Sequence, residues 1–469
     1  MTKAAAVILS LAVFGGILPA LLLAQFSVWN LTAPALAVAS IMIFSAWRLG
    51  VLAGEPVPRP LQITFYIFTY IWLGLTPFLQ VSTGRFPWLA VHSSDDLLAA
   101  AGVVWCGVIA YEAALSISRR RQPKLAPISK TSEVVPILKL AFALLLASAT
   151  VAAVLAATGL WQILFSPRQT DRGIDSVMGL NLAFAFLRIP IAFVAILAGC
   201  ILRSGALTRR TRTASKVVFF ISALLALVVS NPISAPRLMF GSVALGLVLA
   251  CLHWRRWTNL FLVFGLTIGL LVAFPSMDMF RTSLNVSISD PMASYVSKGD
   301  FDAFQMVANT VAFCHLNGHT YGQQFLGALF FWFPRAFWPT KAHGTGVLVG
   351  RGVGYHFLNL SSPLWSEAFV DFGIIGTLCF LFLYGMITAK VEKAYISCIQ
   401  NGWFNLVRVA VAFWAGYQLF FLRGDLQNGL AFCSCFALCL FMARMALTKK
   451  ADDAGRQWNA QAAALRNFS

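Results

Sequence analysis

The chain has 469 residues, of which 59% are hydrophobic and 11% are charged, and its mean hydropathy is +0.77. Soluble domains carry about 25% charged residues, so the composition excludes a globular soluble enzyme and indicates one polytopic membrane domain. The net charge of +18 would point to nucleic acid in a soluble protein, but in a membrane protein excess cations belong to cytoplasmic loops, so we expect no nucleic-acid partner.

Runs of about 20 mostly apolar residues predict twelve membrane-spanning helices. In chain order they cover 4–25, 33–50, 63–82, 97–116, 134–157, 182–202, 216–231, 237–253, 258–275, 367–388, 404–422 and 427–447. The first run also resembles a signal peptide, but the path of the chain works best if it remains a span. We therefore expect an all-α fold with a single transmembrane domain over 1–447 and a short polar tail at 448–469.

Basic clusters predict the orientation of this domain. They lie at 119–124, 207–212 and 254–256, at Lys390 with Lys393, and at Lys449 with Lys450. On an alternating path through twelve spans they all fall on one side, and the positive-inside rule makes that side cytoplasmic. Both termini and the tail then lie in the cytoplasm.

Two long connections lie on the side opposite the cytoplasm, at 158–181 and at about 276–366. Loops longer than about 15 residues are usually functional or disordered. The second loop is rich in Phe, Trp and Tyr, which argues against disorder. Within it, residues 322–334 are apolar but too short to cross a membrane and end at Pro334, which predicts a re-entrant or interfacial helix.

Cations on the outer side need an explanation, because the positive-inside rule disfavours them there. They are Arg85, Arg168, Arg172, Arg188, Arg237, Arg281, Lys298, Arg335, Lys341, Arg351 and Arg423. Most are arginine, which binds phosphate or carboxylate through two parallel hydrogen bonds. A single arginine can also reach lipid headgroups or pair with a nearby aspartate. The set as a whole favours a shared anionic ligand, and a lipid-linked diphosphate fits this position.

Side chains that could take a proton from a hydroxyl group are few. Glu367 opens the tenth span, and Asp371 lies four residues further along the same helix face. The large loop holds His315, His319, His343 and His356. A histidine with a pKa near neutrality can act as a general base, but a polar contact within the loop is the simpler explanation for each of these.

The sequence contains no convincing metal or nucleotide motif. His315 and His319 are four residues apart but lack the adjacent glutamate of a zinc-binding helix. The letters DFD at 300–302 match a metal-binding DxD motif, but they lie on the side without nucleotide sugars. The cysteines at 433–439 lie inside an apolar run, where packing explains them. There is no P-loop and no GxSxG motif, so we expect neither a metal nor another cofactor.

Several segments together resemble a known family. HTYGQQFLGALFFWFPRAFWPTKAHGTGVLVG (319–350), followed by NLSSPLWSEAFVDFGIIGTLCFLFLYG (359–385), is similar to bacterial oligosaccharide repeat-unit polymerases, the Wzy-type O-antigen polymerases. MFRTS (279–283), GDFDAF (299–304) and FLRGDLQNG (421–429) resemble further pieces of that pattern. The resemblance implies a glycosyltransferase of the bacterial inner membrane, with its active site facing the periplasm. Its donor and acceptor would both be undecaprenyl diphosphate-linked oligosaccharide. The resemblance also implies a partner protein that controls chain length.

The resemblance and the charge pattern together predict the site residues. For diphosphate and glycan binding these are Arg281, Arg335, Arg237 and Arg423, followed by Arg168, Arg172, Lys341 and Arg351. For the general base they are Glu367 and His343, with Asp302 third. Two alternatives stay open: an O-antigen ligase, which transfers the glycan to a different acceptor, and a transporter of the same lipid. Transporters tend to have repeated halves and broken helices at the membrane midplane, and neither is evident in this sequence.

Overall fold

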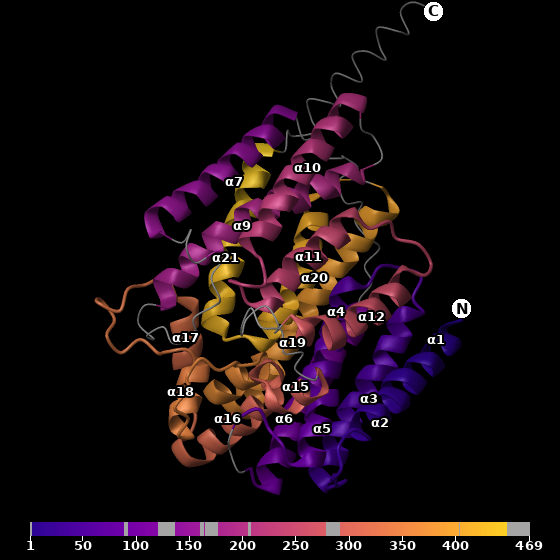
Figure 1. The fold of residues 1–469 in the computed structure, drawn as a ribbon, viewed down its shortest axis with the longest axis vertical. Coiled ribbons are helices and arrows are strands. Elements are labelled where there is room, and N and C mark those ends of the chain that lie inside the picture. The colour runs from indigo at the N-terminus through magenta and orange to yellow at the C-terminus, as the bar shows by residue number, and fades with distance from the viewer. Residues whose placement is uncertain are drawn as a thin grey trace, which may run out of the picture.

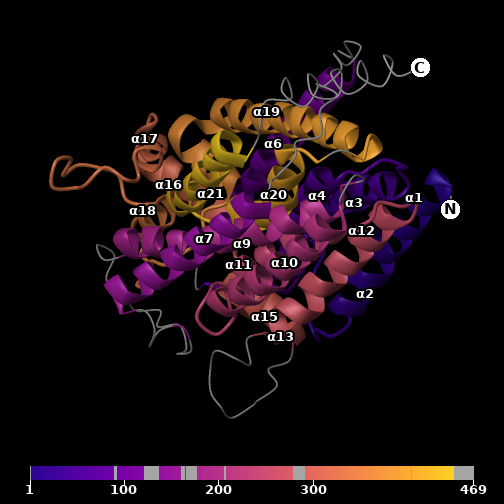
Figure 2. The same ribbon diagram turned by 90° about the horizontal axis from the view of Figure 1, so that it is seen from above.

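The computed structural model describes residues 2–88, 92–120, 137–159, 164, 177–204, 208–277, 291–402 and 404–447. Every regular element in this part of the chain is helical, and the long helices pack into one bundle (Figures 1 and 2). Eleven helices within these ranges are long and apolar enough to cross a membrane. The prediction of an all-α polytopic membrane protein is therefore confirmed.

The first half of the bundle contains α1 (Lys3–Ser10), η1 (Leu11–Ile17), α2 (Leu18–Leu23), α3 (Ala33–Ala53), α4 (Pro60–Tyr70), η2 (Ile71–Leu75), α5 (Thr76–Thr83), α6 (Ser94–Arg120), α7 (Ile137–Thr158), α9 (Val177–Leu202), α10 (Arg209–Val229) and α11 (Arg237–Cys251). The second half contains α12 (Thr258–Ile268), η4 (Gly269–Ala273), α13 (Phe274–Ser276), α15 (Pro291–Ser297), η5 (Gly299–Phe301), α16 (Ala303–Asn317), α17 (Gln323–Leu329), α18 (Thr345–Gly352), α19 (Leu364–Gln400), α20 (Leu406–Arg423) and α21 (Leu426–Leu447).

One of the twelve predicted spans, 237–253, is shorter than expected. The structure forms α11 over 15 residues, which rise only about 22 Å against a hydrocarbon core of about 30 Å. The segment still joins the two ends of the bundle. Arg237 at its start pairs with Asp300, and just beyond its end the Trp254 ring nitrogen donates to the Tyr395 hydroxyl at 2.8 Å. Most of α11 is buried, and non-helical backbone is tolerated at membrane depth where protein surrounds it.

The helix formed by α4, η2 and α5 occupies the centre of the bundle. It is buried along its whole length, although its mean hydropathy of 1.2 is the lowest among the eleven candidate spans of the described ranges. A helix surrounded by protein needs no lipid-facing side, which explains its polar residues. Its aromatic rings stack on neighbours: Phe65 lies 3.7 Å from Tyr111 of α6, and Phe68 lies 6.1 Å from Trp365 of α19.

The tenth predicted span, 367–388, is longer in the structure and is broken near its start. Within α19, Phe372 and Gly373 leave the helical conformation, and Gly373 has a φ of 61°, a value that glycine adopts without strain. The break frees two backbone carbonyls. Those of Val370 and Asp371 accept hydrogen bonds from the amides of Thr320 and Tyr321, at 2.9 and 3.1 Å. The first two turns of α19 are thereby joined to the large loop.

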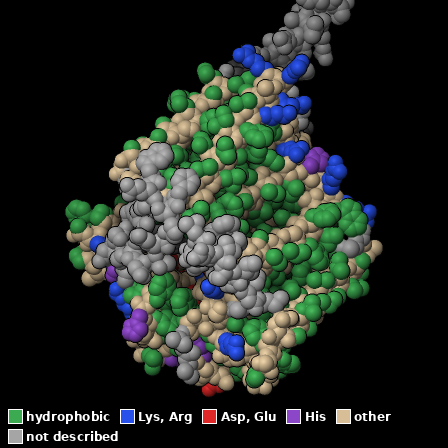
Figure 3. All heavy atoms as spheres, viewed as in Figure 1, with side chains coloured by type: hydrophobic (Ala, Val, Ile, Leu, Met, Phe, Trp, Pro, Cys, Tyr) green, Lys and Arg blue, Asp and Glu red, His purple; other side chains and the backbone are tan. Residues whose placement is uncertain are grey.

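Exposed basic residues gather at one end of the bundle. Figure 3 shows Lys and Arg side chains along its upper right edge, above a face that is largely hydrophobic. Exposed cations in this region include Arg209, Arg210 and Arg212 at the start of α10, and Arg255 and Arg256 just before α12. Three helices run between this basic end and the opposite end of the bundle. The opposite end contains the first residue of α11 (Arg237), the last residue of α20 (Arg423) and the first turn of α19, which includes Glu367. We call that opposite end the site end.

Candidate functional site

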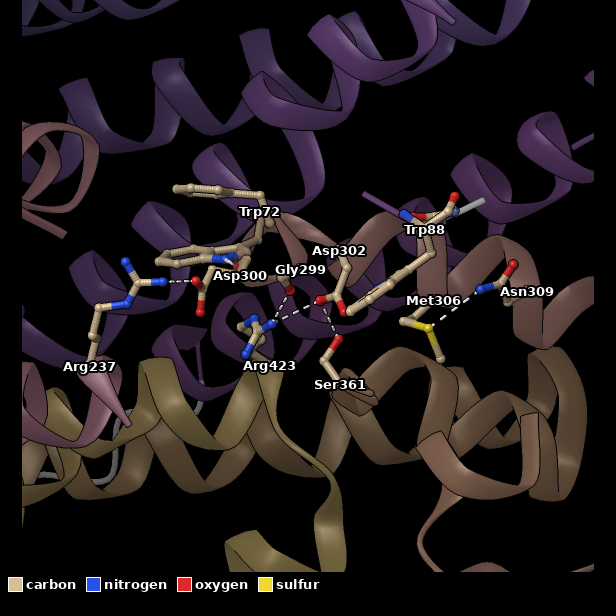
Figure 4. A network of polar contacts seen from close by, with 12 residues as sticks. Trp72, Trp88, Arg237, Gly299, Asp300, Asp302, Met306, Asn309, Ser361 and Arg423 are labelled. Atoms are coloured by element: carbon tan, nitrogen blue, oxygen red, sulfur yellow. Dashed lines mark hydrogen bonds and ion pairs between the residues drawn. The ribbon is translucent and has the colours of Figure 1, made fainter. Parts of the chain in front are cut away.

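The GDFDAF segment is fixed at the site end by the central helix. Its three-residue turn, η5, inserts Phe301 among aromatic rings, with Trp72 at 6.0 Å and Tyr295 at 5.2 Å between centroids. The Trp72 ring nitrogen donates to the carbonyl of Asp300 at 2.8 Å, and the Gln80 amide donates to the carbonyl of Phe301 at 2.9 Å. The turn therefore holds both aspartates of the segment in defined positions (Figure 4).

Asp302 accepts three hydrogen bonds in a site where it is only 1% exposed. The Trp88 ring nitrogen donates at 2.9 Å, the Ser361 hydroxyl at 2.6 Å and the Arg423 guanidinium at 3.0 Å. Arg423 also donates to the carbonyl of Gly299 (Figure 4). A buried carboxylate that accepts three hydrogen bonds is held in a fixed position, so it is well suited to fixing the position of Arg423.

Arg237 forms a second ion pair beside the first. It lies at the start of α11, is buried, and pairs with Asp300 (Figure 4). Its guanidinium also donates to the carbonyl of Phe274 at 3.2 Å and stacks 4.9 Å from the Phe274 ring. Two of the predicted diphosphate ligands, Arg237 and Arg423, are thus brought to consecutive acidic positions of one short turn, 300–302.

Glu367 and Asp425 form a buried carboxyl pair next to this network. Glu367 accepts the Thr345 hydroxyl at 2.7 Å and the amide of Leu426 at 3.1 Å, and it is in electrostatic contact with Asp425. Asp425 accepts amide hydrogens from the first residues of α18 and α21. The two carboxylates therefore join the starts of both helices to the start of α19, where the positive ends of the helix dipoles favour negative charge. Burial raises the pKa of the Asp425 carboxyl, and these amide hydrogens oppose the rise.

The acid–arginine network and the carboxyl pair are linked by residues that lie close together in the chain. Ser361 donates to Asp302, and Glu367 lies six residues further along, in the first turn of α19. Arg423 and Asp425 are likewise separated by a single glycine at the end of α20. Three segments that are far apart in the sequence, 299–304, 359–367 and 421–429, therefore meet in one place. We call this place the acid–arginine centre.

Arg335, Lys341 and His343 lie elsewhere, in the segment between α17 and α18. The Arg335 guanidinium donates to the carbonyls of Lys341 and Ala342, the latter at 3.0 Å. The Lys341 ammonium donates to the carbonyls of Phe331 and Phe333, at 2.7 and 3.0 Å. Burial lowers the pKa of Lys341, and the neighbouring Arg335 lowers it further. Both cations therefore bind the backbone of their own segment.

The remaining predicted residues are dispersed or lie outside the described ranges. Arg351 is exposed on the last turn of α18, and His343 is partly buried just before that helix. Arg168, Arg172 and Arg281 lie outside the described residues, as do most of the 158–181 loop and residues 278–290. Asp371 accepts the amide of Phe325 at 2.7 Å and thus caps the start of α17.

Sequence reasoning missed the residues that assemble the centre. Asp300, Ser361 and Thr345 make the contacts that position the predicted Arg237, Asp302 and Glu367. A signal for all three was present, because each lies in a segment that carries the family resemblance: Asp300 in 299–304, Thr345 in 319–350 and Ser361 in 359–385. The contacts themselves join residues between 22 and 63 positions apart, which local sequence pattern does not predict.

The centre combines chemical groups that suit transfer from a phosphate leaving group. Two guanidinium groups can stabilise negative charge, and buried carboxylates can hold or accept a proton. Among the described residues, no cluster of three or more potential metal ligands is present. Comparisons with protein-family models, with curated proteins and with solved structures found no match to this chain.

Proposed function

We propose that this protein is a membrane glycosyltransferase that polymerises undecaprenyl diphosphate-linked oligosaccharide repeat units into an O-antigen or related surface polysaccharide. The observation that carries the proposal is the meeting of three distant segments at the acid–arginine centre. Each of the three, 299–304, 359–367 and 421–429, resembles part of the Wzy-type polymerases. A chain-length regulator protein is a proposed partner.

The proposed orientation places the acid–arginine centre at the periplasmic face of a bacterial inner membrane. The exposed cations at the starts of α10 and α12 mark the cytoplasmic end under the positive-inside rule. Since α11, α19 and α20 each join that end to the centre, the centre lies on the opposite side of the bilayer. Both termini are then cytoplasmic, and the large loop is periplasmic.

We assign diphosphate binding first to Arg423 and Arg237. Arg423 has a donor left for a ligand, because its Nε is buried and makes no hydrogen bond within the described residues. Both guanidinium groups would stabilise the charge that grows on the diphosphate oxygen as its bond to the anomeric carbon breaks. Arg335, Lys341, Arg351, Arg168, Arg172 and Arg281 remain further predicted ligands.

The general base takes the proton from the acceptor hydroxyl while that oxygen attacks the anomeric carbon from the opposite face, which inverts the configuration. Glu367 is our first assignment, because it lies beside the arginines and next to Asp425, whose carboxyl can receive or share the proton. His343 and Asp302 follow. The diphosphate leaves with its lipid, so the reaction needs no nucleotide.

The test uses purified protein in nanodiscs with a synthetic undecaprenyl diphosphate-linked repeat unit and no nucleotide, and the products are separated by size. A ladder of products is expected from the wild type. Arg423→Gln should lower the rate by about 30- to 1000-fold, equivalent to about 2–4 kcal/mol. Arg423→Lys should recover only part, because lysine lacks the planar fork.

Arg209→Gln is the matched control, since it removes an exposed cation from the opposite end of the bundle. Its ladder should be unchanged. A wild-type protein that transfers the glycan once to a lipid-core acceptor and forms no ladder would indicate a ligase. Protein that moves the lipid between leaflets without forming any product would indicate a transporter.

A further inference from the structure

The segment between α17 and α18 projects from the side of the bundle in both views of the fold (Figures 1 and 2). We call residues 326–343 the aromatic arm. Its two ends are packed closely, because a Cβ added at Gly327 would lie 3.0 Å from the Cβ of Ala342. The arm is therefore a closed projection with a narrow base.

The outer surface of the arm is apolar. Phe337 is 79% exposed and Trp332 is 61% exposed, and Phe330, Leu326 and Leu329 are exposed as well. Monomeric soluble surfaces rarely display large apolar side chains in such a contiguous group. Exposed aromatic residues are typical of the boundary between lipid headgroups and acyl chains.

The charged residues of the arm face its own backbone. Lys341 is only 2% exposed, and its ammonium binds the carbonyls of Phe331 and Phe333. Arg335 binds the carbonyls of Lys341 and Ala342. Irregular backbone can enter an apolar layer only if its polar groups are satisfied internally. Arg335 and Lys341 donate hydrogen bonds to backbone carbonyls of the arm, as the amides of a regular helix would do.

The apolar surface of the arm continues onto a membrane-spanning helix. Phe325, at the base of the arm, packs edge-to-face on Phe380 of α19 with ring centroids 5.3 Å apart. Beside this contact, Ile374 and Ile375 of α19 are exposed, the latter at 74%. Exposed isoleucines on a candidate span form part of the lipid-facing surface. The arm therefore adjoins the bilayer.

We propose that the aromatic arm inserts into the headgroup–acyl boundary of the bilayer leaflet at the site end, so that its partner is phospholipid. The base of the arm leads directly to Thr345, which binds Glu367, while the first amides of α18 bind Asp425. Insertion of the arm thus ties the height of the carboxyl pair to the bilayer surface. This inference concerns membrane contact and does not depend on the reaction proposed above.

The experiment places an environment-sensitive fluorophore at single positions of a cysteine-free variant in phospholipid nanodiscs. The probe is attached at Phe337→Cys and at Trp332→Cys. Ile375→Cys serves as a lipid-facing control, and Asn401→Cys, exposed near the basic end, serves as a water-facing control. Lipids brominated near the headgroup report bilayer contact, and aqueous iodide reports exposure to water.

Phe337 and Trp332 are expected to be quenched by the brominated lipid and protected from iodide, as Ile375 is. In Lys341→Met the freed carbonyls should draw the arm toward water, with loss of the brominated-lipid quenching at position 337. Iodide quenching at 337 equal to that at 401, without quenching by the lipid, would overturn the proposal. Protection from both quenchers in a protein that runs as a dimer would also overturn it, because a second copy would then cover the arm.

A second measurement avoids the cysteine-free background. Wild-type protein in nanodiscs is labelled with a lipid-partitioning diazirine, and the modified peptides are identified by mass spectrometry. Label in the 326–337 peptide at the level found in the apolar peptides of α19 supports insertion. Label confined to the spanning helices contradicts it.

Discussion

At the residue scale, the central question is whether Asp302 acts as a base or holds Arg423. Its three hydrogen bonds favour the second role, because the Arg423 bond is one of them. A double-mutant cycle separates the two. If Asp302 holds Arg423, then Asp302→Asn combined with Arg423→Gln should cost little more than either change alone, with a coupling energy of about 0.5–3 kcal/mol. The measurement is the rate of the proposed reaction, followed as the product ladder in the nanodisc assay.

Additive losses in that cycle would instead give Asp302 an independent role in proton transfer. Ser361→Ala provides a milder version of the same change, since it removes one donor to Asp302 and leaves the ion pair. Its expected cost is about tenfold or less. The melting temperatures of the wild type, of Ser361→Ala and of the three variants in the cycle show whether a lower rate reflects a loss of folded protein.

The Asp425 carboxyl predicts a dependence of stability on pH. Its pKa is raised by burial, so the folded state binds the proton more tightly than the unfolded chain does. The contribution of this carboxyl group to the free energy of unfolding is then largest below the unfolded pKa of about 3.9. That contribution declines as the pH rises from there through the folded pKa. Asn cannot ionise, so Asp425→Asn should lack this decline, and its melting temperature relative to wild type should increase with pH.

The exposed Asp95, at the start of α6, provides the control for this measurement. Asp95→Asn removes one carboxyl group from an exposed position, so it accounts for any general effect of losing one negative charge. A constant difference between Asp425→Asn and the wild type across the same range would mean that Asp425 titrates alike in the folded and unfolded states.

At the scale of elements, the break in α19 carries a prediction about Gly373. Its φ of 61° is strained for any residue with a Cβ, and an added Cβ would lie 3.1 Å from the Nε2 of His319. Gly373→Ala should therefore lower stability by about 1–3 kcal/mol. Gly84 provides the comparison: its φ is 65° and its ψ is 19°, which is the left-handed helical region, and an added Cβ meets nothing within 4 Å. Gly84→Ala should lower the melting temperature less than Gly373→Ala, because Gly373 has a ψ of −146°, which is more strained for a residue with a Cβ, and also faces His319.

An equal loss of melting temperature in the two variants would show that neither the ψ of Gly373 nor its contact with His319 adds to the cost of a positive φ. If neither variant loses stability, a positive φ carries no cost at these positions. The result matters for the site, because the break frees the carbonyls that hold Thr320 and Tyr321, in the middle of the large loop, against α19.

Helices were the part of the fold that sequence could predict. Local hydrophobic pattern decides whether a segment can cross a bilayer, so the predicted 63–82 is observed as 60–83 and the predicted 404–422 as 406–423. The break at Phe372 and Gly373 escaped prediction because the apolar pattern runs through it unchanged. The short length of α11 also escaped prediction. Its apolar composition predicts a full span, but α11 is mostly buried between other helices, where the backbone need not be helical across the whole bilayer.

The acid–arginine centre could be predicted in its members but not in its assembly. Outward-facing arginine signals an anion, and this reasoning named Arg237 and Arg423. Their carboxylate partners depend on the tertiary contact of η5 with α11 and α20, which no local pattern encodes. For Arg335 the charge reasoning overlooked a competing partner, since a cation in an irregular apolar segment can bind that segment's own carbonyls.

For the whole molecule, the asymmetry of charge predicts which end faces the cytoplasm. Lys216 is exposed in α10, in the turn after three arginines, and Arg351 is exposed at the end of α18 on the site side. In a cysteine-free variant expressed in bacterial cells, Arg351→Cys should react with a membrane-impermeant maleimide while the cells are intact. Lys216→Cys should react only after the inner membrane is permeabilised. The positive-inside rule gives the reason, because cations flanking a span resist translocation.

The reverse labelling pattern would place the acid–arginine centre in the cytoplasm, where nucleotide sugars are present and a lipid-linked donor is not required. The proposed reaction would then lose its physical basis even if the centre binds a diphosphate. Labelling of both position 216 and position 351 in intact cells would instead place the start of α10 and the end of α18 on the same side of the membrane. Since α11, α19 and α20 each join the two ends, that outcome would contradict the fold itself. The labelling experiment therefore tests the fold and the proposed function with separate outcomes.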